Sequence, residues 1–222
     1  MPKVGVLLSG CGFLDGAEIH ESVFTLLALD QQQATIICCA PNIEQAAVVD
    51  HQTRQPTGEK RNVLREAARI ARCEIRDVTA VSAADLDALI LPGGFGAATN
   101  LCDFASQGAQ CAVDPDVARL IGDMLARRKP IGAICIAPAL LARVAGQHGI
   151  SATVTIGNDP GTAQAIADTG CVHQDCPVDD IVIDEQHKLV TTPAYMLGTG
   201  PADVWQGIHK LVEAIMKMAR SA

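Results

Sequence analysis

The chain has 222 residues, of which 49% are hydrophobic and 19% charged, and this composition excludes disorder and predicts one compact domain over residues 1–222. The net charge of −8 excludes nucleic acid as a partner, because phosphate binding needs a basic face. The apolar runs are far shorter than the ~20 residues of a membrane span, so no membrane association is expected.

The nine cysteines are an odd number, and several of them lie inside apolar runs. The N-terminal residues enter a strand-like run directly and lack the small-residue cleavage site of a signal peptide. Together these features predict reduced thiols and no disulfide framework. We therefore expect a cytoplasmic protein.

In chain order, short buried runs alternate with segments of helical periodicity. Strands are predicted over residues 4–8, 34–40 and 88–91, in the run that ends at Cys135, and over residues 153–156. Helices are predicted from about residue 17, over 62–72, from Pro115 behind the Asp114 cap, from Pro138, over 162–169 and from about 201. Small hairpins are predicted within residues 42–60 and 181–191.

The first helix is expected to pack through Ile19, Val23, Leu26 and Leu27, which recur at helical spacing. The alternation of strands and helices implies a mostly parallel sheet with helices on both faces and small hairpin excursions. Ligands in such folds bind beyond the carboxyl ends of the strands. Three chemically rich loops, residues 9–21, 92–100 and 135–138, follow predicted strands, so we expect the site there.

Cys135 stands where a buried strand turns sharply into a helix that begins at Pro138. The small residues Ala133 and Ala137 on either side suit a crowded, strained elbow. The amides and the positive dipole end of the helix favour thiolate over thiol, which predicts a nucleophile. The alternative is a buried structural cysteine, since free cysteine is among the most buried residue types.

The run Pro92-Gly-Gly-Phe-Gly96 ends another strand, and its glycines let backbone amides approach a ligand closely. The amides of Gly94 and Ile136 are predicted to form an oxyanion hole, with Gly93 beside the substrate pocket. An ordinary tight turn is the alternative explanation.

Among the acidic residues near the first helix, Glu21 is the candidate acid or base, because a carboxyl group in an apolar pocket can hold or move a proton. Glu18 and Asp15 are better explained as acids that complement the helix dipole or lie just ahead of it. His20 is a candidate for the substrate pocket, with a surface position as the alternative.

No cofactor and no metal are predicted. The glycines after the first strand do not follow the G-x-G-x-x-G pattern of dinucleotide binding, since Gly16 follows Gly12 too late. Cys171, His173 and Cys176 are zinc-competent side chains. A fourth ligand at structural-site spacing is missing, so a local structural role is favoured.

Several motifs together resemble one known superfamily. They are Ala133-Ile-Cys-Ile-Ala-Pro-Ala-Leu-Leu141, Leu91-Pro-Gly-Gly-Phe-Gly-Ala-Ala98 and Gly16-Ala-Glu-Ile-His-Glu21. These resemble the ThiJ/PfpI superfamily, relatives of the class I glutamine amidotransferases. The longer stretches 7–21 and 175–182 are similar to its enhancing-lycopene-biosynthesis branch, also called the glyoxalase ElbB family. The similarity covers nearly the whole chain.

The resemblance implies a flavodoxin-like three-layer sandwich, usually a homodimer. It assigns the family's nucleophile to Cys135, its thiol-contacting glutamate to Glu21 and its oxyanion amides to Gly94 and Ile136. Many relatives carry a histidine directly after the cysteine or in a late His-x-Glu, where this chain has Ile136 and His173-Gln-Asp175. A full Cys-His-acid triad is therefore not predicted.

These residues suit a glutathione-independent, cofactor-free glyoxalase, a glyoxalase III-type lyase that converts glyoxal or methylglyoxal into glycolate or lactate. The chemistry needs one thiolate and one carboxyl group, and it can also be observed as deglycase activity. The expected partner is a small aldehyde or dicarbonyl substrate. The alternatives are a non-enzymatic redox sensor or regulatory protein with an oxidisable cysteine, and an amidotransferase-like hydrolase.

Overall fold

The fold is built around a central, mostly parallel sheet, seen in a computed structural model that describes residues 1–198 and 200–221. Within these residues the sheet has seven strands in the order β10-β11-β7-β6-β1-β2-β5, and only β10 runs antiparallel to its neighbour. The strands are β1 (Lys3–Leu7), β2 (Thr35–Ala40), β5 (Ile75–Asp77), β6 (Ala88–Leu91), β7 (Ile131–Ile134), β10 (Val182–Asp184) and β11 (Leu189–Thr192).

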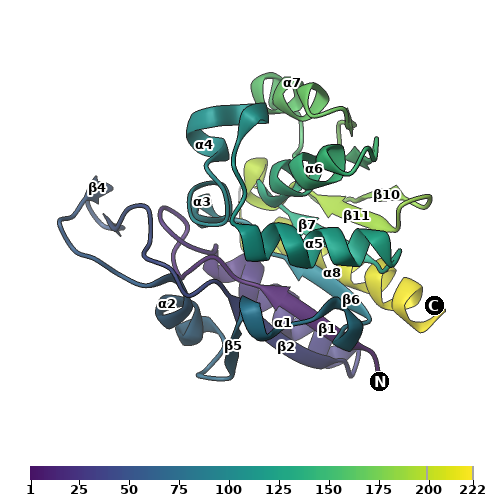
Figure 1. The fold of residues 1–222 in the computed structure, drawn as a ribbon, viewed down its shortest axis with the longest axis horizontal. Helices are drawn as coiled ribbons and strands as arrows, with labels where there is room; N and C mark the ends of the chain where they lie inside the picture. Colours follow the sequence, from purple (N-terminus) through teal and green to yellow (C-terminus); the bar gives the residue numbers. More distant parts are fainter. Residues whose placement is uncertain (199, 222) are drawn as a thin grey trace.

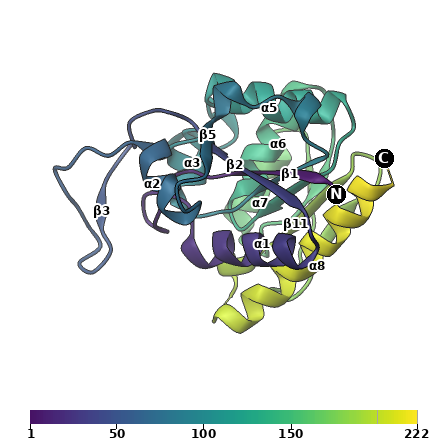
Figure 2. The same cartoon turned by 90° about the horizontal axis from the view of Figure 1, so that it is seen from below.

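Helices cover both faces of this sheet, which gives three layers (Figures 1 and 2). The helices are α1 (Ile19–Gln31), α2 (Val63–Ile70), α3 (Phe95–Thr99), α4 (Phe104–Gln107), α5 (Pro115–Ala126), α6 (Ala137–Gln147), α7 (Pro160–Asp168) and α8 (Pro201–Arg220). One buried apolar cluster joins the sheet to α1, α2 and α8, and a second joins it to α5, α6 and the short helices. The predicted three-layer α/β sandwich is confirmed.

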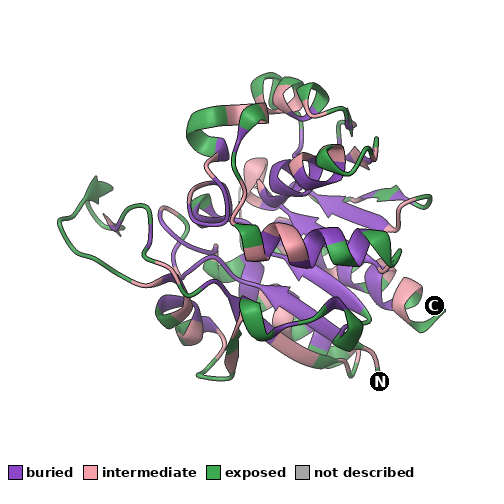
Figure 3. Ribbon diagram, in the orientation of Figure 1, coloured by how far each residue is buried: buried purple, intermediate pink, exposed green. Residues whose placement is uncertain are grey.

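The inner strands β1, β6 and β7 are buried on both faces, as the purple strands of Figure 3 show. Their sequences are accordingly continuous apolar runs without polar alternation, which is typical of a parallel sheet covered by helices. One edge of the sheet is formed by the carboxyl ends of the strands β1, β6, β7 and β11. The loops that follow these strands carry the candidate site.

Both predicted hairpins are present. Strands β3 (Val49–Asp50) and β4 (Gln55–Pro56) pair in a small hairpin that projects from the body of the molecule (Figures 1 and 2). The second hairpin is formed by β10 and β11 at the edge of the main sheet. The segment predicted as a strand over 153–156 yields only β8 (Thr153–Val154), which pairs with β9 (Val172–His173) outside the main sheet.

The packing predicted for the first helix is wrong. Ile19, Val23 and Leu27 are each more than 40% exposed, whereas Leu26, the fourth residue of the predicted face, packs partly against the core. The buried side of α1 instead carries Glu21, Ser22 and Thr25, followed by Ala28 and Leu29. The buried hydroxyl groups on this side have hydrogen-bond partners nearby, since those of Ser22 and Thr25 donate to the carbonyls of Glu18 and Glu21. Helical spacing of apolar residues thus identified the helix but not the side that it buries.

The part of the chain that the structure describes holds no helix with the length and apolarity needed to cross a membrane.

Two leucines of α1 provide a direct test of this orientation. Leu29 is fully buried and Leu27 is 44% exposed. We expect Leu29→Ala to lower the free energy of unfolding by about 2–5 kcal/mol through the cavity it leaves. Leu27→Ala is expected to cost less than about 1 kcal/mol, as for other surface substitutions. Urea unfolding of both variants measures the difference, and equal costs would contradict the orientation described here.

Candidate active site

Cys135 lies at a tight elbow between β7 and α6, with a φ of 62°. Its amide donates to the carbonyl of Thr192, the last residue of β11, at 2.9 Å, which fixes the elbow to the neighbouring strand. Left-handed backbone is strained for a residue with a Cβ. Ala133 and Ala137, on either side, are fully buried, so small side chains are what the crowded elbow accepts. The predicted strand-to-helix elbow is thus present.

Two backbone amides donate to the Cys135 sulfur, those of Gly94 and Ile136, and both lower the pKa of the thiol. Gly94 has a φ of 93°, and a Cβ at this position would collide with the backbone of Gly16 and Glu18. A glycine is therefore required there by both conformation and space. The two amides predicted as an oxyanion hole lie together at the sulfur.

Glu21, in the first turn of α1, is fully buried. Its Oε2 accepts from the Gly93 amide at 2.9 Å, and its Oε1 accepts from the Tyr195 amide at 3.3 Å. The carboxyl group also shares a hydrogen bond with the Cys135 thiol. Gly93 permits this contact, because a Cβ there would fall against the Cys135 Cβ and 2.8 Å from Glu21 Oε2.

Burial raises the pKa of Glu21 from 4.5 to about 8, and the charge of Glu18 adds to the effect, while the hydrogen bonds from Tyr195, Gly93 and Cys135 oppose it. Burial also raises the pKa of the Cys135 thiol, against the two amides. The thiol is therefore less acidic than the helix end alone predicts. In neutral solution the Cys135–Glu21 pair retains at least one proton, which the hydrogen bond can pass between sulfur and carboxyl group.

A cavity of about 500 Å³ opens beside the sulfur, with walls that are mainly apolar. Its lining comes from the loop after β1, the region of α3 and α4, the elbow, the start of α7 and the turn after β11. The lining residues are Phe13, Glu18, Gly94, Phe95, Ala98, Phe104, Ala105, Cys135, Ile136, Thr162, Tyr195 and Met196.

His20 contacts this site only through a neighbour. Its Nδ1 lies 2.7 Å from the Tyr195 hydroxyl, and the His20 side chain itself is exposed. The sequence motifs do not single out Tyr195, Phe104, Thr162 or Met196. Tyr195 and Met196 follow β11, so the rule that ligands bind beyond strand ends could have singled out the turn after that strand.

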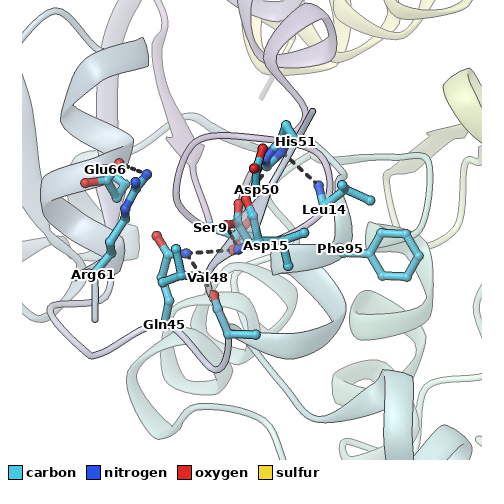
Figure 4. A network of polar contacts seen from close by, with 12 residues as sticks. Ser9, Leu14, Asp15, Gln45, Val48, Asp50, His51, Arg61, Glu66 and Phe95 are labelled. Atoms are coloured by element: carbon cyan, nitrogen blue, oxygen red, sulfur yellow. Dashed lines mark hydrogen bonds and ion pairs between the residues drawn. The ribbon is translucent and has the colours of Figure 1, made fainter. Parts of the chain in front are cut away.

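Asp15, an acidic residue just ahead of the first helix, has a structural role, because it connects two loops (Figure 4). Its carboxylate accepts from the Val49 amide at 2.8 Å and lies 3.9 Å from His51 Nε2, which accepts from the Leu14 amide. The Gln45 side chain donates to the Asp15 carbonyl at 3.2 Å. These contacts tie the loop after β1 to the base of the β3–β4 hairpin, and so hold one wall of the cavity.

His173, the late histidine considered for a triad, has other partners. Its Nε2 accepts from the Ile156 amide at 3.3 Å, and its Nδ1 lies 3.6 Å from Asp175. Cys171 and Cys176 direct their thiols to backbone carbonyls. Across residues 1–198 and 200–221, no group of three or more His, Cys, Asp or Glu side chains is arranged to hold a metal ion.

Comparison with known proteins identifies relatives of this chain. No family model matches the chain. A human protein described as glutamine amidotransferase-like class 1 domain-containing protein 3, mitochondrial, is 42% identical over 226 residues, covering 97% of this chain and 83% of its own length. The zebrafish ES1 protein, mitochondrial, is 32% identical over 235 residues and covers 97% and 86% of the two chains.

A solved structure from Ehrlichia chaffeensis, described as an isoprenoid biosynthesis protein with an amidotransferase-like domain, superposes with a TM-score of 0.93. It is 33% identical and covers 98% of this chain and 99% of its own. The fold and the elbow cysteine define a class I glutamine amidotransferase-like protein. The chain belongs to the class I glutamine amidotransferase-like family of these relatives, in agreement with the resemblance that its motifs showed.

The predicted cytoplasmic location is contradicted, since the human and zebrafish relatives are both described as mitochondrial. The prediction was a default drawn from reduced cysteines. Cysteine usage separates oxidising from reducing surroundings, but it does not distinguish one reducing compartment from another.

The raised pKa of Glu21 predicts a pH-dependent contribution to stability. Folding raises this pKa from 4.5 to about 8, so the contribution is complete below about pH 4.5 and is lost as the pH rises through 8. Relative to Glu21→Gln, the wild type should therefore lose a few kcal/mol between pH 5 and 9, at about 1.4 kcal/mol per unit of pKa shift. Urea unfolding at pH 5, 7 and 9 measures this.

The exposed Glu185→Gln serves as the control for general effects of pH on the unfolding of the chain. Wild-type and Glu21→Gln stabilities that stay parallel over the whole range would refute a buried, neutral carboxyl group at this position.

Proposed function

We propose that the protein is a glutathione-independent, cofactor-free glyoxalase that converts glyoxal into glycolate and methylglyoxal into lactate. One observation carries the proposal: the Cys135 thiol and the Glu21 carboxyl group share a hydrogen bond at the base of an accessible cavity. The pair combines a nucleophile with a proton donor and acceptor at the same point.

The reactive form of the pair holds one proton, and in the first step the Glu21 carboxylate takes this proton from the thiol as the Cys135 sulfur attacks the aldehyde carbon. A C–S bond forms, the C=O π bond breaks, and the resulting alkoxide takes the proton from Glu21, which yields a hemithioacetal. The amides of Gly94 and Ile136 are suited to stabilise the developing negative charge, since both point at the sulfur.

In the second step the Glu21 carboxylate removes the hydrogen on the carbon bonded to sulfur. The electron pair moves into an enediolate, the hydroxyl proton on the first carbon passes to the oxygen of the adjacent carbon, and Glu21 returns its own proton to that carbon, which gives a thioester. Water then cleaves the thioester, releases the 2-hydroxy acid and restores the thiol. A buried carboxyl group with a pKa near 8 accepts and returns a proton readily near neutral pH.

The environment of the thiol argues against the two alternatives. Redox-sensing cysteines are low-pKa and solvent-accessible, whereas Cys135 is 7% exposed and burial raises its pKa. Amidotransferase chemistry needs a general base that activates the thiol and then protonates the departing ammonia, and Ile136 occupies the position directly after the nucleophile, where many relatives carry a histidine.

The proposed chemistry predicts that both partners are required for turnover. Cys135→Ser should abolish production of glycolate and lactate, and Glu21→Gln should lower kcat at least about 10²-fold, as expected for loss of an acid–base group. Cys73→Ser, at an exposed cysteine, is the matched control and should keep wild-type activity. Wild-type turnover that survives Cys135→Ser would refute the mechanism.

A further inference from the structure

The cavity beside Cys135 is much larger than the substrates just considered. Its volume of about 500 Å³ lies within the range of pockets that hold drug-sized molecules, about 300–1,000 Å³. Glyoxal and methylglyoxal have only a handful of non-hydrogen atoms. When either molecule is bonded to the sulfur, most of the cavity volume stays unfilled.

The aromatic side chains of the molecule are concentrated in this cavity. The chain contains four phenylalanines and one tyrosine, and the lining includes Phe13, Phe95, Phe104 and Tyr195. Three separate segments contribute them: the loop after β1, the α3–α4 region and the turn after β11. Such convergence in a chain with 3% aromatic residues indicates a wall suited to an apolar, ring-sized group.

Two of these rings are exposed to solvent. Phe13 is 42% exposed and Phe95 is 53% exposed. Burial of their apolar surface under a bound group is favourable at about 25 cal/mol for each Å² removed from water. A substituent that reaches these rings therefore gains binding free energy that methylglyoxal cannot gain.

The charge of the lining limits what that substituent can be. Glu18 is a lining residue, and no lysine or arginine is among the lining residues that the structure describes. A carboxylate or phosphate in the cavity loses its hydration without gaining a cationic partner. The hydroxyls in the lining are those of Thr162 and Tyr195, which already pair with Asp159 and His20, and neither carries a charge that could balance an anion.

We propose that this site prefers α-oxoaldehydes with an uncharged, apolar substituent of aromatic size, and that it rejects anionic analogues of the same shape. The proposal rests on the glyoxalase chemistry above and names the substrate class for it. Phe13 and Phe95 determine the preference for the apolar group, and Glu18 excludes the anionic one.

The test compares phenylglyoxal, 4-carboxyphenylglyoxal and methylglyoxal as substrates. Phe95→Ala and Phe13→Ala should each lower the ratio of kcat/KM for phenylglyoxal to kcat/KM for methylglyoxal about 3- to 10-fold, the range expected when one aromatic contact is removed. Phe24→Leu replaces the remaining phenylalanine, which packs against Trp205 and His20 outside the cavity, and should leave this ratio unchanged.

The charge is tested separately. The Glu18 carboxylate accepts a hydrogen bond from the Glu21 amide and so caps α1. In Glu18→Gln the amide oxygen of the new side chain can accept the same hydrogen bond. The variant should raise kcat/KM for 4-carboxyphenylglyoxal at least about 5-fold relative to phenylglyoxal. Equal use of the two aryl substrates by the wild type, or a loss for methylglyoxal as large as that for phenylglyoxal in the phenylalanine variants, would overturn the proposal.

A binding measurement keeps this inference distinct from the proposed function. Acetophenone lacks the aldehyde, so its binding to Cys135→Ser by ligand-observed NMR requires no chemistry. Weaker binding in Cys135→Ser/Phe95→Ala supports the specificity even where no aldehyde is turned over. Turnover of methylglyoxal together with acetophenone binding that is insensitive to Phe95 contradicts the specificity and leaves the glyoxalase function intact.

Discussion

The hydrogen bond between the Cys135 thiol and the buried Glu21 carboxyl group is the contact on which the site depends. It requires β7 to end in a left-handed elbow and α1 to begin beside the end of β6. It also requires that no side chain stand at residue 93. The energetic cost is considerable, because burial opposes ionisation of both groups. The proton transfer proposed above requires such a pair, and buried groups with shifted pKa values are typical of functional sites.

The same demand explains the inverted packing of α1. A helix that buries its apolar stripe against the sheet would turn Glu21 toward solvent, since Ile19, Val23 and Leu27 lie on the other side. The side of α1 that carries Glu21 is buried instead. The hydroxyl residues on that side donate hydrogen bonds to carbonyl groups within the helix. The position of one functional side chain has here overridden the usual relation between hydrophobic periodicity and burial.

Most of the fold was predictable because parallel strands buried on both faces are continuous apolar runs, and Asp114 and Pro115 begin a helix by local chemistry alone. The elbow was likewise predictable, since its motif is local in the chain, whereas the contact of Glu21 with the thiol was implied by the family resemblance. The strand β5 was missed because three residues carry no periodic signal. Tyr195, Phe104 and Met196 were missed because only tertiary packing brings them to Cys135. The high pKa of the thiol was missed for the same reason, since burial cannot be read from a loop.

The site divides into a floor made of backbone and a wall made of interchangeable side chains. The floor, with its glycines at 93 and 94, has no room for variation, since any added atom collides with the reacting groups or the backbone. The wall comes from separate loops whose exposed rings can be exchanged one at a time without disturbing the buried core. Homologues can thus share one chemistry while diverging in the compounds they accept, and an assay on one member does not transfer to the next.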